Sequence, residues 1–153
     1  MKGNQRLDYR AVGATGVTSL DALHGYVLSR SQLPRRLVEL VFLRASQING
    51  CAYCMGAHSR KLLEKGLTAD QLALVPVWRE AGDLFDEQER AALAWTEAVT
   101  NLGEHGVPDE SFAAAAARFG EKSLVDLTLA IALMNAYNRL AIGFRTTPEA
   151  LAI

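Results

Sequence analysis

Hydrophobic side chains recur at helical spacing along almost the whole chain, and this pattern constrains its fold more than any other feature. No stretch alternates polar and apolar residues for long enough to predict a β-strand. A chain of 153 residues has the length of one ordinary domain. The sequence therefore predicts an all-α fold: a single helical domain over residues 1–153, of roughly six to seven helices, with its core at about residues 18–145.

Capping signals and helix breakers predict where these helices begin and end. Three capping boxes are predicted, beginning at Thr18, Thr68 and Asp86. Pro34 suits the first turn of a helix, and Asn49-Gly50 suits the end of one. The predicted helices lie at about 18–29, 34–48, 51–66, 68–76, 86–102, 108–120 and 122–142.

The charge and the apolar segments exclude two classes of partner. Sixteen Lys and Arg residues oppose 17 Asp and Glu residues, which leaves a net charge of −1 without a basic run. A nucleic-acid binder that works by bulk charge is therefore not expected. The N-terminus lacks an apolar signal segment, and the stretch from Leu127 to Asn138 is shorter than the roughly 20 residues that span a bilayer. We expect a cytoplasmic protein with no nucleic-acid and no membrane partner.

Two of the predicted helices are apolar in nearly every direction. These are the segments 37–44 and 127–134. One interpretation places both at the centre of the domain. The other is an oligomer whose protomers share these faces, since exposed apolar patches of this size mark interfaces. The sequence leaves both interpretations open.

The two cysteines of the chain, Cys51 and Cys54, form a Cys-x-x-Cys pair. Because Asn49-Gly50 ends the preceding helix, both should lie at the start of the next one. At about 100° per residue, Cys51, Cys54 and His58 share an arc of about 60° on that helix. A helix N-terminus stabilises a thiolate, and His58 is placed to accept its proton. These residue types in this pattern are typical of an activated thiol.

Two other readings of the pair are weaker. A structural zinc site needs four ligands, so His24 or His105 would have to join Cys51, Cys54 and His58 from elsewhere in the chain. A buried, purely structural pair of thiols would make the spacing and the helix-start position coincidental. A thioredoxin fold is disfavoured because a helix, not a strand, precedes the motif. Redox chemistry of the thiol pair is therefore favoured.

Glu39 is the other residue whose role the sequence leaves open. Local spacing alone favours a solvated carboxylate that faces Arg35 one turn earlier. The alternative is a partly buried carboxylate whose pKa is raised by desolvation and which shuttles protons near neutral pH. If the helices on either side of Asn49-Gly50 pack antiparallel, Glu39 returns toward the thiols.

The remaining polar and aromatic candidates give weaker signals. Tyr53, between the cysteines, is more simply a packing aromatic than a phenol in a proton network. His24 and His105 have no partner pattern and are interpreted as ordinary residues. The expected core residues are Trp78, Trp95 and Met134.

Taken together, Glu39, Cys51, Cys54 and His58 stand at the spacing Glu-x11-Cys-x2-Cys-x3-His. This pattern resembles the signature of the alkylhydroperoxidase D-like proteins of the carboxymuconolactone decarboxylase superfamily. The resemblance favours a functional Glu39 over a solvated one. The flanking segments that also resemble the family are 43–54, 126–131 and 135–139.

The resemblance implies an all-helical homo-oligomer, a homotrimer or a homohexamer, that reduces organic hydroperoxides. By the same resemblance, Cys54 attacks the peroxide and becomes a sulfenic acid, and Cys51 resolves it to a disulfide. His58 and Glu39 form the proton relay. An external dithiol, a lipoyl or thioredoxin-like reductant, restores the thiols. Neither a metal nor an organic cofactor is implied.

The chain departs from the peroxidase pattern at Tyr53, where the best-known members carry histidine. A phenol is a poorer base than imidazole at neutral pH. We therefore keep Tyr53 as a site residue whose contribution to the relay differs from that of histidine. The function predicted is antioxidant defence by a thiol-dependent peroxidase. The alternative is a non-enzymatic redox-sensing or binding oligomer of the same superfamily.

Overall fold

The computed structural model describes residues 4–149, and every helix or strand assigned in that range is a helix. A single isolated bridge, between Gly103 and Gly106, is the one β-type pairing in that range. The predicted all-α class is therefore confirmed. The α-helices, in chain order, are α1 (Tyr9–Val12), α2 (Ala14–Ser29), α3 (Arg35–Asn49), α4 (Ala52–Glu64), α5 (Ala69–Ala73), α6 (Glu87–Thr100) and α7 (Asp109–Gly143).

Most of the predicted boundaries agree with the structure. Thr68 caps α5 and Asp86 caps α6, each in a reciprocal capping box with the residue three positions later. Pro34 immediately precedes α3, and Gly50 ends it in a left-handed conformation at φ 70°. Two short 3-10 helices, Val75–Glu80 and Gly82–Leu84, join α5 to α6, and Pro76 lies in the first turn of the former.

The N-terminal capping box predicted at Thr18 is wrong. α2 begins at Ala14, and the Thr18 hydroxyl donates a hydrogen bond to the Ala14 carbonyl, 2.8 Å away, inside the helix. Asp21 does not cap α2 either, because its carboxylate binds Arg10 and Tyr137 instead. α1 was not predicted; its four residues are capped by the side chain of Asp8.

The two helices predicted at about 108–120 and 122–142 follow each other directly as the two parts of α7, with a kink between them. Gly120 interrupts the helical backbone between them, with φ 68° and ψ 170°. This combination is accessible almost only to glycine, so the sequence signal at this position was correct. The break lets the Ala-rich first part of α7 turn away from its long second part.

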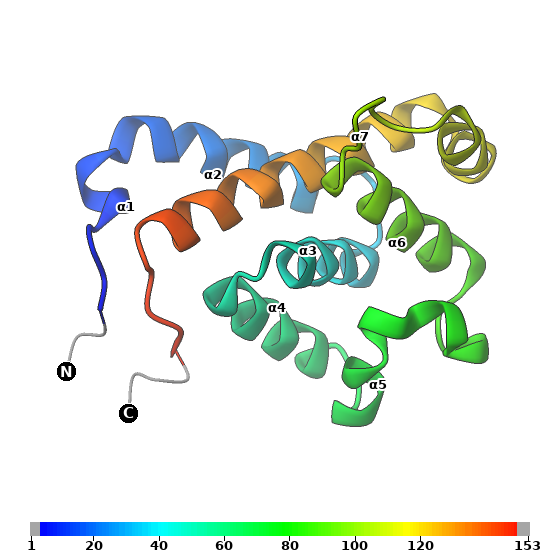
Figure 1. Cartoon of the computed structure of the whole chain (residues 1–153), viewed down its shortest axis with the longest axis horizontal. Coiled ribbons are helices and arrows are strands. Elements are labelled where there is room, and N and C mark those ends of the chain that lie inside the picture. The colour runs from blue at the N-terminus through cyan, green and yellow to red at the C-terminus, as the bar shows by residue number, and fades with distance from the viewer. Residues whose placement is uncertain (1–3, 150–153) are drawn as a thin grey trace.

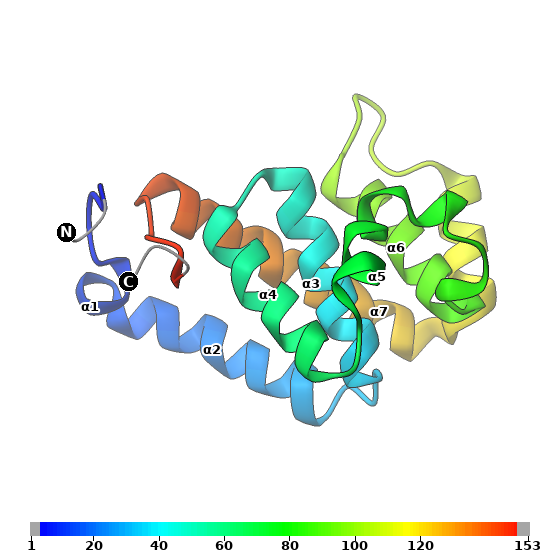
Figure 2. The same ribbon diagram turned by 90° about the horizontal axis from the view of Figure 1, so that it is seen from below.

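α3 occupies the centre of the fold. Figure 1 shows it nearly end-on, with α2 and α7 above it, α4 below it and α6 beside it, and α3 contacts α4, α6 and α7. The view from below shows α4 beside α3, with α2 along one edge of the molecule and α7 passing behind α3 and α4 (Figure 2). The buried residues of α3 are Leu37, Val38, Glu39, Leu40, Val41, Phe42, Leu43, Ala45 and Ser46.

The apolar surfaces of α3 and of the second part of α7 are thus used inside one chain. Leu127, Ile131 and Leu133 are fully buried against α3 and its neighbours. The first of the two interpretations, a central position in the domain, therefore accounts for both helices. Trp78, Trp95 and Met134 are also buried, as predicted. Among the described residues, no helix is both long enough and apolar enough to cross a membrane.

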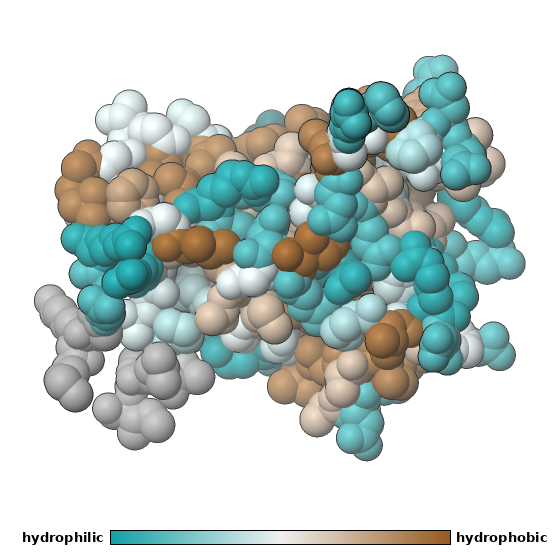
Figure 3. Space-filling view, in the orientation of Figure 1, coloured by the Kyte–Doolittle hydropathy of each residue, from teal (hydrophilic) through white to brown (hydrophobic). Residues whose placement is uncertain are grey.

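Exposed hydrophobic side chains are distributed rather than continuous on the face shown in Figure 3, where hydrophilic residues separate the brown patches. An apolar groove of about 400 Å³ lies between α6 and both parts of α7. Phe112 and Val125 on its rim are more than half exposed, at 55% and 57%.

Candidate active site

The turn from α3 to α4 places both cysteines at the first turn of α4, as the sequence predicted. Gly50 reverses the chain, and Cys51 is the N-cap residue, whose sulfur accepts a hydrogen bond from the Cys54 backbone N–H at 3.3 Å. The two sulfurs are joined in a disulfide, with a Cα–Cα distance of 5.3 Å. Both residues are almost completely buried. The helix start therefore presents a redox pair rather than two independent thiols.

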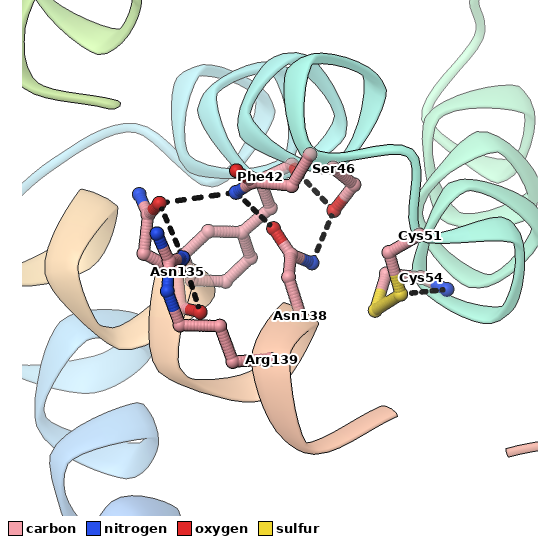
Figure 4. Close-up of a disulfide and its surroundings, with 8 residues drawn as sticks. Phe42, Ser46, Cys51, Cys54, Asn135, Asn138 and Arg139 are labelled. Carbon is pink, nitrogen blue, oxygen red and sulfur yellow. Dashed lines mark hydrogen bonds between the residues drawn. A yellow bond between two sulfur atoms is a disulfide. The ribbon is translucent and has the colours of Figure 1, made fainter. Parts of the chain in front are cut away.

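A buried network of amides anchors this turn to α7 (Figure 4). Asn49, the last residue of α3, donates hydrogen bonds from Nδ2 to Oδ1 of Asn135 and to Oδ1 of Asn138, at 3.0 and 2.9 Å. Asn138 in turn donates to the Ser46 hydroxyl, which donates to the Phe42 carbonyl. This network explains why an Asn-rich segment stands at 135–139, which the sequence patterns alone left without a role.

Glu39 lies beside His58 and does not face Arg35 in solvent. His58 Nδ1 donates a hydrogen bond to Glu39 Oε2 at 2.8 Å. Both side chains are buried, with 8% of the His58 side chain and 3% of the Glu39 side chain exposed. The local interpretation of Glu39 as a solvated carboxylate is therefore wrong, because α4 packs back against α3 across the Gly50 turn. The alternative prediction, in which α3 and α4 pack together and bring Glu39 back toward the helix of the thiols, is confirmed.

The expectation of a raised pKa at Glu39 is also wrong. Burial by itself would raise the pKa, but the hydrogen bond from His58 and the charges of His58, Lys61 and His24 together outweigh it and lower the pKa. Lys61 Nζ is 3.8 Å from Glu39 Oε1. Glu39 thus remains a carboxylate at neutral pH. A carboxylate on Nδ1–H directs the lone pair of the neutral His58 imidazole to Nε2.

A pocket of about 140 Å³ opens beside the disulfide. Among the predicted site residues, Cys54, His58 and Tyr53 line it, whereas Cys51 and Glu39 lie behind its wall. Of the two cysteines, therefore, only Cys54 lines the pocket. The other residues that line the pocket are Tyr9, Arg10, His24, Ala57, Lys61, Met134, Tyr137 and Ala141.

Several of these lining residues were missed or misread in the sequence. His24, interpreted as ordinary, belongs to the pocket wall. Tyr137 donates a hydrogen bond to Asp21 at 2.6 Å, and Arg10 pairs with the same carboxylate at 3.3 Å. The hydrogen bond from Tyr137 contributes most to lowering the pKa of Asp21. Burial, followed by the same hydrogen bond, raises the pKa of Tyr137. No local pattern links α1, α2 and α7, so only their packing reveals this wall.

His105, the third histidine, is exposed in the loop between α6 and α7 and takes no part in the site. In the part of the chain that the structure describes, no three His, Cys, Asp or Glu side chains are grouped as a metal site requires. The site thus consists of a disulfide, a carboxylate–imidazole pair and an aromatic pocket with two cationic side chains.

Known proteins share both the sequence and the arrangement of this chain. Residues 17–98 match the Carboxymuconolactone decarboxylase family. An uncharacterised protein of Bacillus subtilis, YdfG, is 31% identical over 140 residues, which cover 92% of this chain and 94% of YdfG. A protein of unknown function from Agrobacterium tumefaciens, suggested to be the antioxidant defence protein AhpD, is 39% identical with a TM-score of 0.88 over 95% of this chain and 98% of that one.

The debrominase Bmp8 has the same fold at lower sequence identity. It is 21% identical with a TM-score of 0.80, over 92% of this chain and 74% of that one. At this identity the likeness concerns the arrangement of helices, and the chemistry of each chain depends on its own site residues.

Proposed function

The chain belongs to the carboxymuconolactone decarboxylase family, as an alkylhydroperoxidase D-like member, and on this premise we propose that it is a thiol-dependent peroxidase that reduces organic hydroperoxides. The observation that carries the proposal is a disulfide-bonded cysteine pair, one member of which lines a small pocket beside a carboxylate-bound imidazole. Structural disulfides need no such base and no such opening.

In the reduced protein, Cys54 is the attacking thiol, because it is the cysteine that lines the pocket. His58 removes the thiol proton, and the buried carboxylate of Glu39 stabilises the resulting imidazolium. The thiolate forms an S–O bond with the hydroperoxide while the O–O bond breaks. The products are a sulfenic acid on Cys54 and an alcohol, whose proton comes from His58.

Cys51 completes the cycle from behind the pocket wall. Its sulfur attacks the sulfenic acid, the S–S bond forms, and the oxygen leaves as water with the Cys51 proton. An external dithiol, of the lipoyl or thioredoxin-like class, then reduces the disulfide by exchange and is itself oxidised. We place this reaction in the cytoplasm, where such dithiols stay reduced, and in a homotrimer or a homohexamer.

The proposal is tested by steady-state turnover of cumene and tert-butyl hydroperoxide with dithiothreitol, dihydrolipoamide or reduced thioredoxin as the electron donor. We expect turnover by the wild-type protein and none by Cys54→Ser. Cys51→Ser should form a sulfenic acid that dimedone traps, without sustained turnover through the internal disulfide. The two variants are near-isosteric, so each serves as the folding control for the other.

Failure of every donor to support hydroperoxide turnover by wild-type protein would overturn the peroxidase proposal. If the pair nevertheless cycles between thiols and disulfide, and the mass of the assembly changes with it, the protein is the redox-sensing oligomer instead. Thiol titration before and after one equivalent of hydroperoxide, followed by size-exclusion chromatography with light scattering, separates these outcomes.

A further inference from the structure

His24 of α2 shares the pocket with Cys54 and His58 but has no part in the steps described above. Its ring packs on Phe42, with 5.8 Å between centroids, and on Tyr137 edge-on at 6.2 Å. Phe42 also contacts the ring of His58, at 5.1 Å. One fully buried phenyl ring therefore holds both imidazoles in place, which is the rigid support that a reacting group requires.

The two imidazoles differ in their polar contacts. Among residues 4–149, His58 is hydrogen-bonded to Glu39, whereas the half-buried ring of His24 makes no hydrogen bond to another side chain. Burial first, and then the charges of Lys61 and His58, lower the pKa of His24 below its ordinary 6.5, against the opposing charges of Glu39 and Asp21. His24 is thus a neutral imidazole at neutral pH, with one N–H to donate.

The direction of peroxide cleavage determines where such a donor is useful. When a thiolate attacks a hydroperoxide, the sulfur, the attacked oxygen and the leaving oxygen lie roughly in line. Cys54 and His58 are on α4, whereas His24 reaches the same pocket from α2, the helix that lies farther from α4 in Figure 1. The leaving oxygen therefore develops its negative charge away from the Cys54 sulfur, in the pocket whose wall contains His24.

We propose that His24 stabilises the leaving alkoxide by donating an imidazole N–H to it, an assignment that rests on the peroxidase function proposed above. The electron pair of the O–O bond goes to the alkoxide while sulfur is oxidised, and the alkoxide receives the proton that His58 took from Cys54. His24 keeps its own proton throughout. A preorganised donor of this kind acts where charge develops, so it accelerates the bond-breaking step rather than substrate binding.

The test compares leaving groups in a single oxidation of the reduced protein. Wild type and His24→Phe are mixed with excess tert-butyl hydroperoxide or peracetic acid, and the remaining thiols are titrated over time. Loss of one such donor typically costs about 100- to 1,000-fold in rate. We expect a slowing of this order with tert-butyl hydroperoxide, at an unchanged apparent KM. With peracetic acid the effect should be no more than a few-fold, because a carboxylate is a weakly basic leaving group that needs little stabilisation.

Two further variants separate this role from folding. His24→Gln keeps an N–H donor and should retain more of the tert-butyl hydroperoxide rate than His24→Phe does. His105→Phe alters an exposed histidine outside the pocket and should react like wild type with both oxidants. Circular dichroism and the thermal midpoint of each variant establish that it is folded before its rates are compared.

The possible failures are distinct. If wild-type thiols resist tert-butyl hydroperoxide, the peroxidase proposal fails and the assignment of His24 fails with it. If wild type reacts and His24→Phe is slowed equally with both oxidants, or not at all, only the assignment of His24 is overturned. An equal slowing would mean that His24 supports the shape of the pocket and does not act on the leaving oxygen.

Discussion

The contact between Glu39 and His58 shows how far a single residue depends on its surroundings. In sequence, Glu39 is an acid one turn from Arg35, and a solvent-exposed ion pair is the simplest account. In the structure it is buried and bonded to an imidazole 19 residues later. Its lowered pKa makes it a permanent charge that orients His58, rather than a group that gains and loses protons during turnover.

The stability of the fold should depend on this charge in a defined range of pH. Because folding lowers the pKa of Glu39 below 4.5, its stabilising contribution is complete above that value and is lost as the pH falls through the folded-state pKa. We expect Glu39→Gln to reduce the free energy of unfolding by about 1–3 kcal/mol at pH 7. The difference from wild type should shrink below pH of about 4.5.

Urea denaturation from pH 3 to 8 measures this dependence. Glu64→Gln is the matched control, since Glu64 is exposed at the end of α4 and its replacement should change stability little. A constant difference between Glu39→Gln and wild type over the whole range would contradict a lowered pKa at Glu39.

At the scale of the elements, the short turn between α3 and α4 decides the geometry of the site. Gly50 ends one helix and Cys51 begins the next, so the cysteine pair has little freedom relative to α3. The amides of Asn49 and Asn138 then fix the end of α3 to α7. The position of the cysteine pair therefore depends on α3 and α7 as well as on α4, at whose start both cysteines lie.

Asn138→Ala tests this anchor. The substitution removes an acceptor from Asn49 and a donor to Ser46, and Ser46 is fully buried. Leaving buried polar groups without partners costs about 1–3 kcal/mol each, so we expect a loss of at least that order in the free energy of unfolding. Asn101→Ala, at the exposed end of α6, is the control. Equal urea midpoints for the two variants would show that the amide network does not support the fold.

The break in α7 provides a second test at this scale. Gly120 has a backbone conformation that side chains with a Cβ rarely adopt, at φ 68°. Gly120→Ala should therefore destabilise the protein by about 1–3 kcal/mol. Gly25→Ala, inside α2 and with open space around its Cα, should instead stabilise it by up to about 1 kcal/mol. Thermal unfolding of both variants measures the contrast; the same sign for both would be inconsistent with a strained Gly120.

At the scale of the whole molecule, the pocket exists only because four helices meet. α1 supplies Arg10, α2 supplies His24, α4 supplies the thiol and α7 supplies Tyr137. The hydrogen bonds of Asp21 tie three of these helices together around the pocket. A substrate in this pocket would meet groups drawn from both ends of the chain.

The homotrimer or homohexamer remains a prediction, and light scattering tests it directly. We expect a mass of three or six times the 16.6 kDa of one chain. Val125→Glu places a charge on the rim of the apolar groove between α6 and α7, and should lower this mass if copies pair there. Val12→Glu, at another exposed valine, is the matched control. A monomeric wild-type protein would contradict the prediction.

Local interactions made most of the fold predictable from the sequence. Hydrophobic periodicity, the caps at Thr68 and Asp86 and the glycines at 50 and 120 act over a few residues, so they identified the helices and the redox pair at a helix start. The exception at the N-terminus has a tertiary cause. Asp21, which by its spacing should cap a helix, binds Arg10 and Tyr137 because folding brings those residues to it.

The chemistry around the cysteines was decided by the tertiary structure, because it depends on contacts between distant residues. Spacing alone placed Cys54 and His58 on one helix, but only packing showed that Glu39 is buried on His58 and that its pKa is lowered. Packing also placed His24 in the pocket wall, where no sequence pattern could have put it. The sequence by itself determined an all-α chain with a cysteine pair at a helix start. Long-range burial, which sets the dielectric and the partners of each charged group, determined what surrounds that pair.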